Sequence, residues 1–289
     1  MTGGILMGLG ATIAGGCTIG GLYFPIAIGA PTGFVMFIGI ILGAIVGYKC
    51  QLQLMMSVLW GRKQSTGITP STSKSKYLGL TLFALLSLWA VIWYFSEQRS
   101  LSYRALIIIV GFSLGALMQR SRFCMSSAIR SPIIGGDHQM SIALAVLLIL
   151  STFICGVVIH LFKLDVLFAV PATFWLGSLL GGVIFGVGMV FGGGCSTGSL
   201  WRAAEGNGKS IVTIIFMAWS CSVFSAIGNK FAVFTREITE NWLERSMLGI
   251  QYFLNNNLNE FLLTNSLTII FLLCWYCLIK FAVTKKLYF

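Results

Sequence analysis

The sequence predicts an all-α, polytopic membrane protein with broken short helices and internal pseudo-symmetric repeats. First, hydrophobic residues make up 57% of the 289 residues and charged residues only 9%, whereas a soluble domain carries about 25% charged residues. Second, uncharged stretches recur that approach the roughly 20 residues needed to cross a bilayer. Third, a glycine-rich motif ending in cysteine occurs three times. No polar linker divides the chain, so we expect a single membrane domain over residues 1–289.

A frame of two glycines and one cysteine opens the chain. It lies in residues 4–24 as Gly4-x3-Gly8-x8-Cys17, and it returns in residues 182–206, where it ends at Cys195. The shift between the two copies is a constant 178 residues, which predicts an internal repeat. The same shift pairs Gly10 with Gly188, Gly15 with Gly193, Gly16 with Gly194, Thr18 with Ser196, Gly20 with Gly198 and Leu22 with Leu200.

A third copy of the frame lies in residues 111–130 and ends at Cys124. Its central glycines are replaced by a segment that carries Arg120 and Arg122. A glycine costs a helix about 1 kcal/mol relative to alanine, so each glycine-interrupted run is expected to break. A half-helix that enters the bilayer and breaks is tolerated where it is buried in protein or lines a water-filled path. We therefore expect re-entrant short helices at these places.

The remaining apolar stretches read as ordinary membrane spans, and their flanking charges predict a topology. One span holds Gly39, Gly43 and Gly47 on a single helix face, which lets another helix pack closely. The loop 61–76 is basic and is placed in the cytoplasm, and the acid-rich segment 234–260 is placed outside. The net charge of +11 is mostly this topological bias. The predicted spans are 33–48, 78–95, 141–162, 211–233 and 262–284, while residues 105–130 hold the third copy of the frame and residues 172–191 lead into the copy that ends at Cys195.

The three motif cysteines are the candidate functional residues. Cys17, Cys124 and Cys195 each fall where a half-helix is expected to end, so they are predicted to converge near a central constriction. The alternative is that the glycines only serve packing and the thiols are inert. Free N–H groups at broken helices hold anions, and a thiol is a weak donor that suits a soft sulfur-bearing anion. The backbone is expected to approach the anion at Gly15, Gly16, Gly193 and Gly194.

Other chemistries find little support in the sequence. The spans contain almost no ionisable residue, and His160 is interpreted as structural. Arg120 and Arg122 are expected to form an electropositive mouth, or else to be topological charge. Arg202 and Glu205 lie three residues apart, a spacing at which they can pair on a helix. A formal CxxC in residues 274–277 has no second pair. We expect no metal, no cofactor, no nucleic-acid partner and no enzyme.

Taken together, the three motifs resemble the YeeE/YedE family of bacterial sulfur-transport membrane proteins. The strings at residues 4–24, 111–130 and 186–206 occur in the family's order, and the resemblance covers roughly residues 1–233. It implies inner-membrane uptake of thiosulfate or a role in selenium metabolism, and an hourglass of pseudo-symmetric halves with re-entrant helices. It also implies that Cys17, Cys124 and Cys195 line the path, and that small TusA-like sulfur carriers are cytoplasmic partners.

The chain departs from that pattern in two ways. By repeat logic Cys17 should have an upstream partner, as Cys195 has Cys124, so we expect a short or N-terminally truncated member. Ser131 also replaces an acid found in many members. The leading hypothesis is a multi-pass inner-membrane facilitator for a small sulfur-containing anion, thiosulfate. The alternatives are a membrane sulfurtransferase that forms a cysteine persulfide, with Arg120 and Arg122 activating Cys124, and a selenium-metabolism accessory protein.

Overall fold

The structure is a computed structural model, and every regular element that it describes is a helix. It describes residues 1–28, 30–58, 99–134, 139–162, 175–231, 266, 268–277 and 280. The helices are α1 (Thr2–Ile13), η1 (Thr18–Tyr23), α2 (Phe24–Ile28), α3 (Pro31–Val58), α5 (Arg99–Ser121), α6 (Met125–Ile134), α7 (Gln139–Phe162), α8 (Trp175–Gly192), α9 (Ser196–Ala204) and α10 (Gly208–Phe231).

Five helical stretches in this part of the chain are long and apolar enough to cross a membrane. The prediction of an all-α polytopic membrane protein is therefore confirmed. Helices α3 and α7 cover the spans predicted at 33–48 and 141–162, and α10 covers most of the span predicted at 211–233. The five stretches are Thr2–Ile28, Thr32–Gln53, Gln139–Val158, Leu176–Ala204 and Gly208–Ile227. The predicted basic loop 61–76, the span 78–95, the acidic segment 234–260, the basic tail 285–286, most of the span 262–284 and the side chain of His160 lie outside the described residues.

The chain forms two compact units, which are described separately. One unit is Gly61–Phe123, and its described part is α5 with the residues that follow it. The other unit comprises Met1–Trp60 and Cys124–Phe289, and it contains the other helices. The two copies of the frame that are related by the 178-residue shift both lie in this larger unit.

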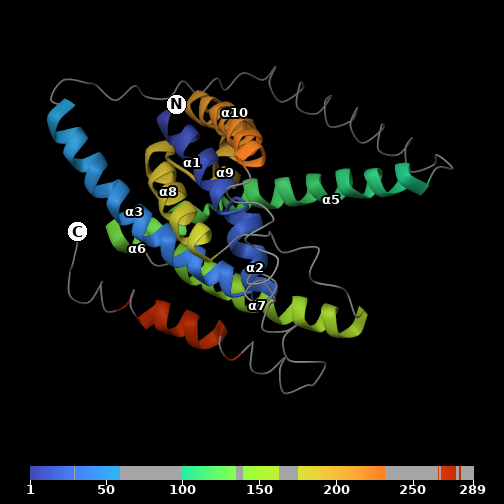
Figure 1. Cartoon of the computed structure of the whole chain (residues 1–289). Helices are drawn as coiled ribbons and strands as arrows, with labels where there is room; N and C mark the ends of the chain where they lie inside the picture. The colour runs from blue at the N-terminus through green and yellow to red at the C-terminus, as the bar shows by residue number, and fades with distance from the viewer. Residues whose placement is uncertain are drawn as a thin grey trace. The chain divides into compact units, whose positions relative to one another are not determined.

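Helices α1 and α8 are packed side by side and run antiparallel along a seam of glycines (Figure 1). A Cβ added at Gly10 would meet the backbone of Phe185, and one added at Gly188 would meet the backbone of Met7. Met7 and Phe185 are themselves related by the repeat shift, so the two contacts are the same contact made twice. The two helices are therefore related by a pseudo-two-fold axis that crosses the seam at right angles, the arrangement of an inverted repeat, as in many transporters.

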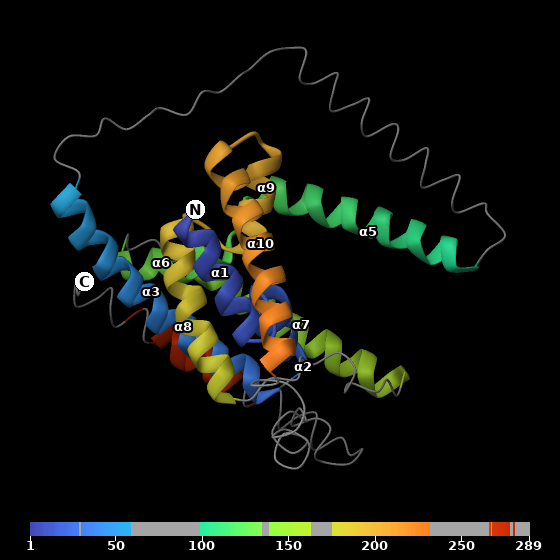
Figure 2. The same cartoon turned by 45° about the horizontal axis from the view of Figure 1, so that its top comes forward.

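Each helix of this pair also packs along its side against a long helix of the other repeat. Helix α3 packs on α8, and α10 packs on α1 (Figure 2 shows the same neighbours from a second side). The predicted glycine ladder makes the first contact, because a Cβ at Gly39 or Gly43 would meet the carbonyls of Leu179 and Val183. Gly4 and Gly8 do the same against α10. Such small-residue faces let backbones approach closely in the absence of a strong hydrophobic drive between helices.

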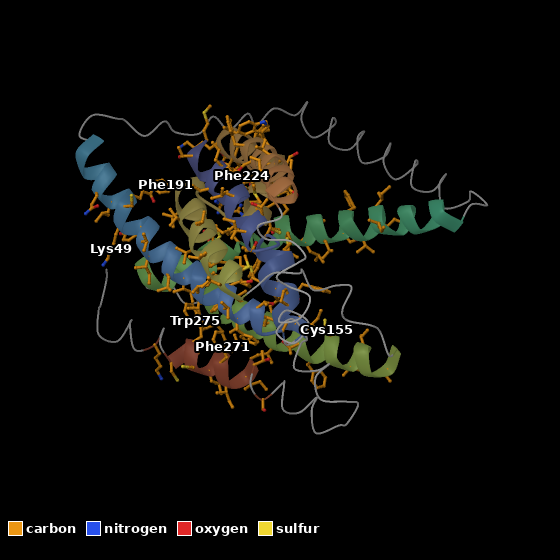
Figure 3. All side chains as sticks on the ribbon, viewed as in Figure 1. Lys49, Cys155, Phe191, Phe224, Phe271 and Trp275 are labelled. Atoms are coloured by element: carbon orange, nitrogen blue, oxygen red, sulfur yellow. The ribbon has the colours of Figure 1, made fainter. Side chains whose placement is uncertain are left out.

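The C-terminal helical segment Thr268–Cys277 covers the outer face of α3. Phe271 stacks edge-to-face on Phe34 and Phe37, with ring centroids 5.0 and 5.7 Å apart, and Trp275 does so on Phe37 at 5.2 Å. Figure 3 shows both aromatic side chains between this segment and α3. Edge-to-face pairs add about 0.5–1.5 kcal/mol each beyond the burial of their area. The segment therefore supports the scaffold beside α3.

Candidate functional site

The residue two positions before each motif cysteine has a left-handed backbone. The φ angles are +74° at Gly15, +75° at Gly193 and +50° at Arg122. Glycine adopts this conformation without penalty, whereas a side chain is strained there. The third copy of the motif thus keeps the turn although it has lost the glycine. All three frames end a helix with the same local geometry, which sequence spacing alone had suggested.

Each motif cysteine then caps the short helix that follows. The carbonyl of Cys17 accepts a hydrogen bond from the N–H of Gly21 at 2.7 Å. The carbonyls of Cys124 and Cys195 accept from Ala128 at 3.0 Å and Ser199 at 2.8 Å, four residues on in each case. These are the first intrahelical bonds of η1, α6 and α9. The N-terminus of a helix carries partial positive charge and free N–H groups, so each cysteine lies where an anion is favoured.

Cys124 and Cys195 are brought together. Their Sγ atoms lie 3.8 Å apart, both side chains are 1% exposed, and either thiol can donate to the other. The Cys195 Sγ also accepts a hydrogen bond from the backbone N–H of Gly198 at 3.2 Å. Only glycine fits at position 198, because a Cβ there would collide with the Cys124 Sγ. The pair is therefore a closely fitted, buried dithiol between the starts of α6 and α9.

Cys17 does not join this pair directly. The helix before it ends beside the other end of the seam, since a Cβ at Gly181 would meet Ala14 whereas one at Gly3 would meet Gly192. Cys17 is half-buried, and its side chain caps no backbone group of η1. The two repeats thus present their cysteines from opposite ends of the α1–α8 seam. Their short helices still meet, because α9 contacts both η1 and α6.

The predicted approach glycines differ in their surroundings. Gly193 and Gly15 are exposed, Gly16 is half-buried and Gly194 is buried. The Gly193 carbonyl accepts a hydrogen bond from Nη1 of Arg202 at 2.7 Å. It is one of the carbonyls that a helix C-terminus leaves without an intrahelical partner.

Two other sequence expectations have a different outcome. Arg202 lies over the ring of Trp201, 5.3 Å from its centroid, and among the described residues it makes no ion pair with Glu205. Arg202 therefore does not pair with Glu205 on the surface of α9. Through its hydrogen bond to Gly193 it links α9 to the turn that precedes Cys195. Arg120 and Arg122 have exposed side chains, at the end of α5 and just beyond it. Their role as an electropositive mouth stays a prediction.

Short segments are held by α7, which contacts both α2 and α6. The hydroxyl of Ser141 on α7 donates to the carbonyl of Ala128 in α6, and both groups are buried. Among the described residues no group of three or more His, Cys, Asp or Glu side chains gathers to hold a metal ion. The site thus consists of thiols, hydroxyls and backbone groups at broken helices.

Sequence reasoning did not predict the part that four residues play in this site. Gly198 and Arg202 contact the dithiol pair and its turn, and Thr18 and Ser196 place hydroxyls directly after two of the cysteines. The available signal was their position, because Gly198, Thr18 and Ser196 all belong to pairs matched by the repeat shift. Nothing in the spacing revealed that the Sγ atoms of Cys124 and Cys195 would touch.

These features define a class: a multi-pass helical membrane protein with thiol-bearing broken helices in an inverted repeat. The chain matches the family model described as "Sulphur transport" over residues 1–46 and 120–288, and it belongs to that family. The resemblance expected from the motifs is thereby confirmed. No solved structure matches the chain significantly.

Curated relatives have transporter names. The chain is 27% identical over 212 residues to "Probable transporter YedE" of Escherichia coli K12, a match that covers 71% of this chain and 50% of the relative. It is 38% identical over 114 residues to "Thiosulfate transporter TsuA" of the same organism, covering 39% and 32%. TsuA of Spirochaeta thermophila is 31% identical over 121 residues, covering 42% and 34%. The chain spans about half the length of the YedE relatives that it matches.

Proposed function

We propose that the chain is a bacterial inner-membrane facilitator for thiosulfate. The observation that carries the proposal is the buried pair of Cys124 and Cys195, whose Sγ atoms lie 3.8 Å apart at the starts of two short helices. Membership of a sulfur-transport family and the names of the TsuA relatives support the substrate class. A thiol is a soft, weakly donating group, which suits the terminal sulfur of thiosulfate better than a hard oxyanion such as sulfate.

Passage through the site would use weak, successive contacts. The anion would meet Cys17 at one end of the seam and Cys124 with Cys195 at the other, with S–H groups donating to its terminal sulfur. Left-handed turns at Gly15 and Gly193, followed by Gly16 and Gly194, would let the backbone approach. Partial positive charge at the short-helix N-termini would offset the charge of the anion. Conduction requires sites strong enough to admit an ion and weak enough to release it.

No covalent step belongs to this proposal. The competing candidate is a sulfurtransferase, favoured by the proximity of two thiols. In that reaction a cysteine thiolate would attack the sulfane sulfur of thiosulfate, its S–S bond would break, and sulfite would leave as a persulfide formed on the protein. Intact-mass measurement after exposure to thiosulfate separates the two. A stable added sulfur atom would support the enzyme, whereas uptake without it supports the facilitator.

Uptake in proteoliposomes tests the role of the thiols. We expect Cys17→Ala, Cys124→Ala and Cys195→Ala each to reduce the uptake of sulfur-labelled thiosulfate strongly. The double variant of Cys124 and Cys195 should be no worse than either single one, because paired groups act as a unit. Cys155→Ala, a half-buried cysteine on α7 outside the frames, is the matched control. Unchanged uptake in all three motif variants would refute the thiol path.

Two further parts of the proposal concern partners and specificity. A TusA-like sulfur carrier in the cytoplasm would receive the imported sulfur, with Arg120 and Arg122 as the electropositive mouth that it or the anion meets. Pull-down of such a carrier by the wild-type chain but not by an Arg120→Gln/Arg122→Gln variant tests this. Competition of uptake by selenite or sulfite decides between a thiosulfate facilitator and a role in selenium metabolism.

A further inference from the structure

Among the described residues three buried side-chain hydroxyls have no hydrogen-bonding partner, and the repeat relates two of them to each other. These two are the Oγ1 of Thr18 and the Oγ of Ser196, the first residues of η1 and α9. Thr18 is 0% exposed. Each follows its motif cysteine directly, Cys17 or Cys195. The large majority of buried polar side-chain atoms in proteins have a partner, so a matched pair of exceptions calls for an explanation.

Local helix chemistry does not satisfy them. A serine or threonine inside a helix commonly donates to the carbonyl four residues earlier. For Thr18 that residue is Ala14 and for Ser196 it is Gly192, each at the end of the preceding helix and on the far side of the left-handed turn. The third copy of the motif has Met125 at the corresponding position, after the cysteine that lies against Cys195. A hydroxyl residue therefore follows Cys17 and Cys195, the two cysteines related by the repeat, but not Cys124.

We infer that Thr18 and Ser196 bind the oxygen atoms of the transported anion while the adjacent thiol contacts its sulfur. The inference rests on the proposed function and deepens it, because it assigns the two ends of one ligand to two kinds of donor. A hydroxyl is a harder donor than a thiol and forms strong hydrogen bonds to a charged oxygen. The class of ligand that fits both is a small oxyanion with a terminal sulfur. Each half of the chain supplies one such thiol–hydroxyl couple.

The couple acts on the anion in transit. The hydroxyl oxygens are enclosed, so the anion would reach them when the short helices move apart. Helix η1 has π-helical bonding, a form that occurs frequently at functional sites. Hydroxyls without a resting partner then have no internal bond to break when the anion arrives.

Thr18→Val and Ser196→Ala test the inference in the full chain. We expect each to raise the KM for thiosulfate uptake about tenfold or more, the effect of losing a hydrogen bond to a charged group. The maximal rate should change less, and Thr18→Ser should restore the KM. The thermal unfolding temperature in detergent should be unchanged or higher, because removing an unpartnered buried hydroxyl breaks no bond.

Thr32→Val is the matched control. Thr32 has a buried, unpartnered hydroxyl near the start of α3, but it follows no cysteine, so its variant should keep the wild-type KM. A wild-type KM in both Thr18→Val and Ser196→Ala would overturn the inference while leaving thiosulfate transport intact. A lower unfolding temperature would also overturn it, since the hydroxyl would then hold the fold. If the wild-type chain takes up no thiosulfate, the proposed function itself fails.

Discussion

The two repeat-related motifs share a backbone but not an environment. Cys17 and Cys195 both follow a left-handed glycine and both open a short helix with extended backbone, their ψ values being −172° and 173°. Yet Cys195 is buried, its Sγ accepts from the N–H of Gly198, and it lies 3.8 Å from a second thiol, whereas Cys17 is half-buried and its side chain makes no capping hydrogen bond. The two repeats thus share the backbone geometry that positions the thiol, but the groups in contact with the thiol differ. One end of the seam is a fitted dithiol, and the other is a single accessible thiol.

Alanine at Gly198 should have the largest effect on this difference. An added Cβ would collide with the Cys124 Sγ and come 3.4 Å from the Cys195 Sγ. Overpacking of this kind costs about 1–3 kcal/mol, and the thiol pair should be forced apart. A thiol oxidant such as diamide should join Cys124 to Cys195 in the wild type and much less in Gly198→Ala, as measured by peptide mass mapping.

The repeat supplies the control for that experiment. Gly20 is the counterpart of Gly198, and a Cβ there would meet nothing within 4 Å. Gly20→Ala should therefore leave cross-linking, stability and uptake close to wild type. Equal loss of function in both variants would show that the two halves are packed alike, which would contradict the asymmetry.

The left-handed turns should give the next largest effect. Gly193 has open space around it, so Gly193→Ala tests the backbone alone. It should lower the free energy of unfolding by about 1–2 kcal/mol, the cost of placing a side chain in the left-handed region. Arg122→Gly should change it by less than about 1 kcal/mol, since the relief of strain is offset by greater freedom of the unfolded chain. Thermal unfolding in detergent measures both. An unchanged stability in Gly193→Ala would contradict the left-handed backbone at Gly193.

The smallest effect is expected at Arg202, which links α9 to the turn before Cys195. The corresponding position in the first repeat is Phe24, so this link exists in one half alone. Arg202→Gln should lower the free energy of unfolding by about 1 kcal/mol or less, because its hydrogen bond to Gly193 is exposed. Glu205→Gln should leave the free energy of unfolding unchanged. A larger loss of stability in Glu205→Gln than in Arg202→Gln would instead indicate an ion pair between Arg202 and Glu205.

Much of the architecture could be predicted from composition and spacing. The span expected at 141–162 is α7, and the glycine ladder at Gly39 and Gly43 packs as its spacing requires. The cysteine frames were also visible, because glycine spacing and repeat shift are written in the sequence. Contacts between segments were not: the dithiol distance and the bond from Arg202 to Gly193 depend on how helices cross. A pattern along one chain shows which residues share a face, and it leaves open which faces meet.

The glycine seam between α1 and α8 has a consequence for the ancestry of the protein. Its contacts are reciprocal, Gly10 against Phe185 and Gly188 against Met7, and this reciprocity is what defines an isologous interface between two identical subunits. A chain of one repeat could therefore have paired with a second copy of itself along the same line. Duplication and fusion of its gene would preserve that contact. A symmetric pair of identical chains carries the same residues on both sides, whereas two halves of one chain can differ, so one half can hold a dithiol that the other lacks.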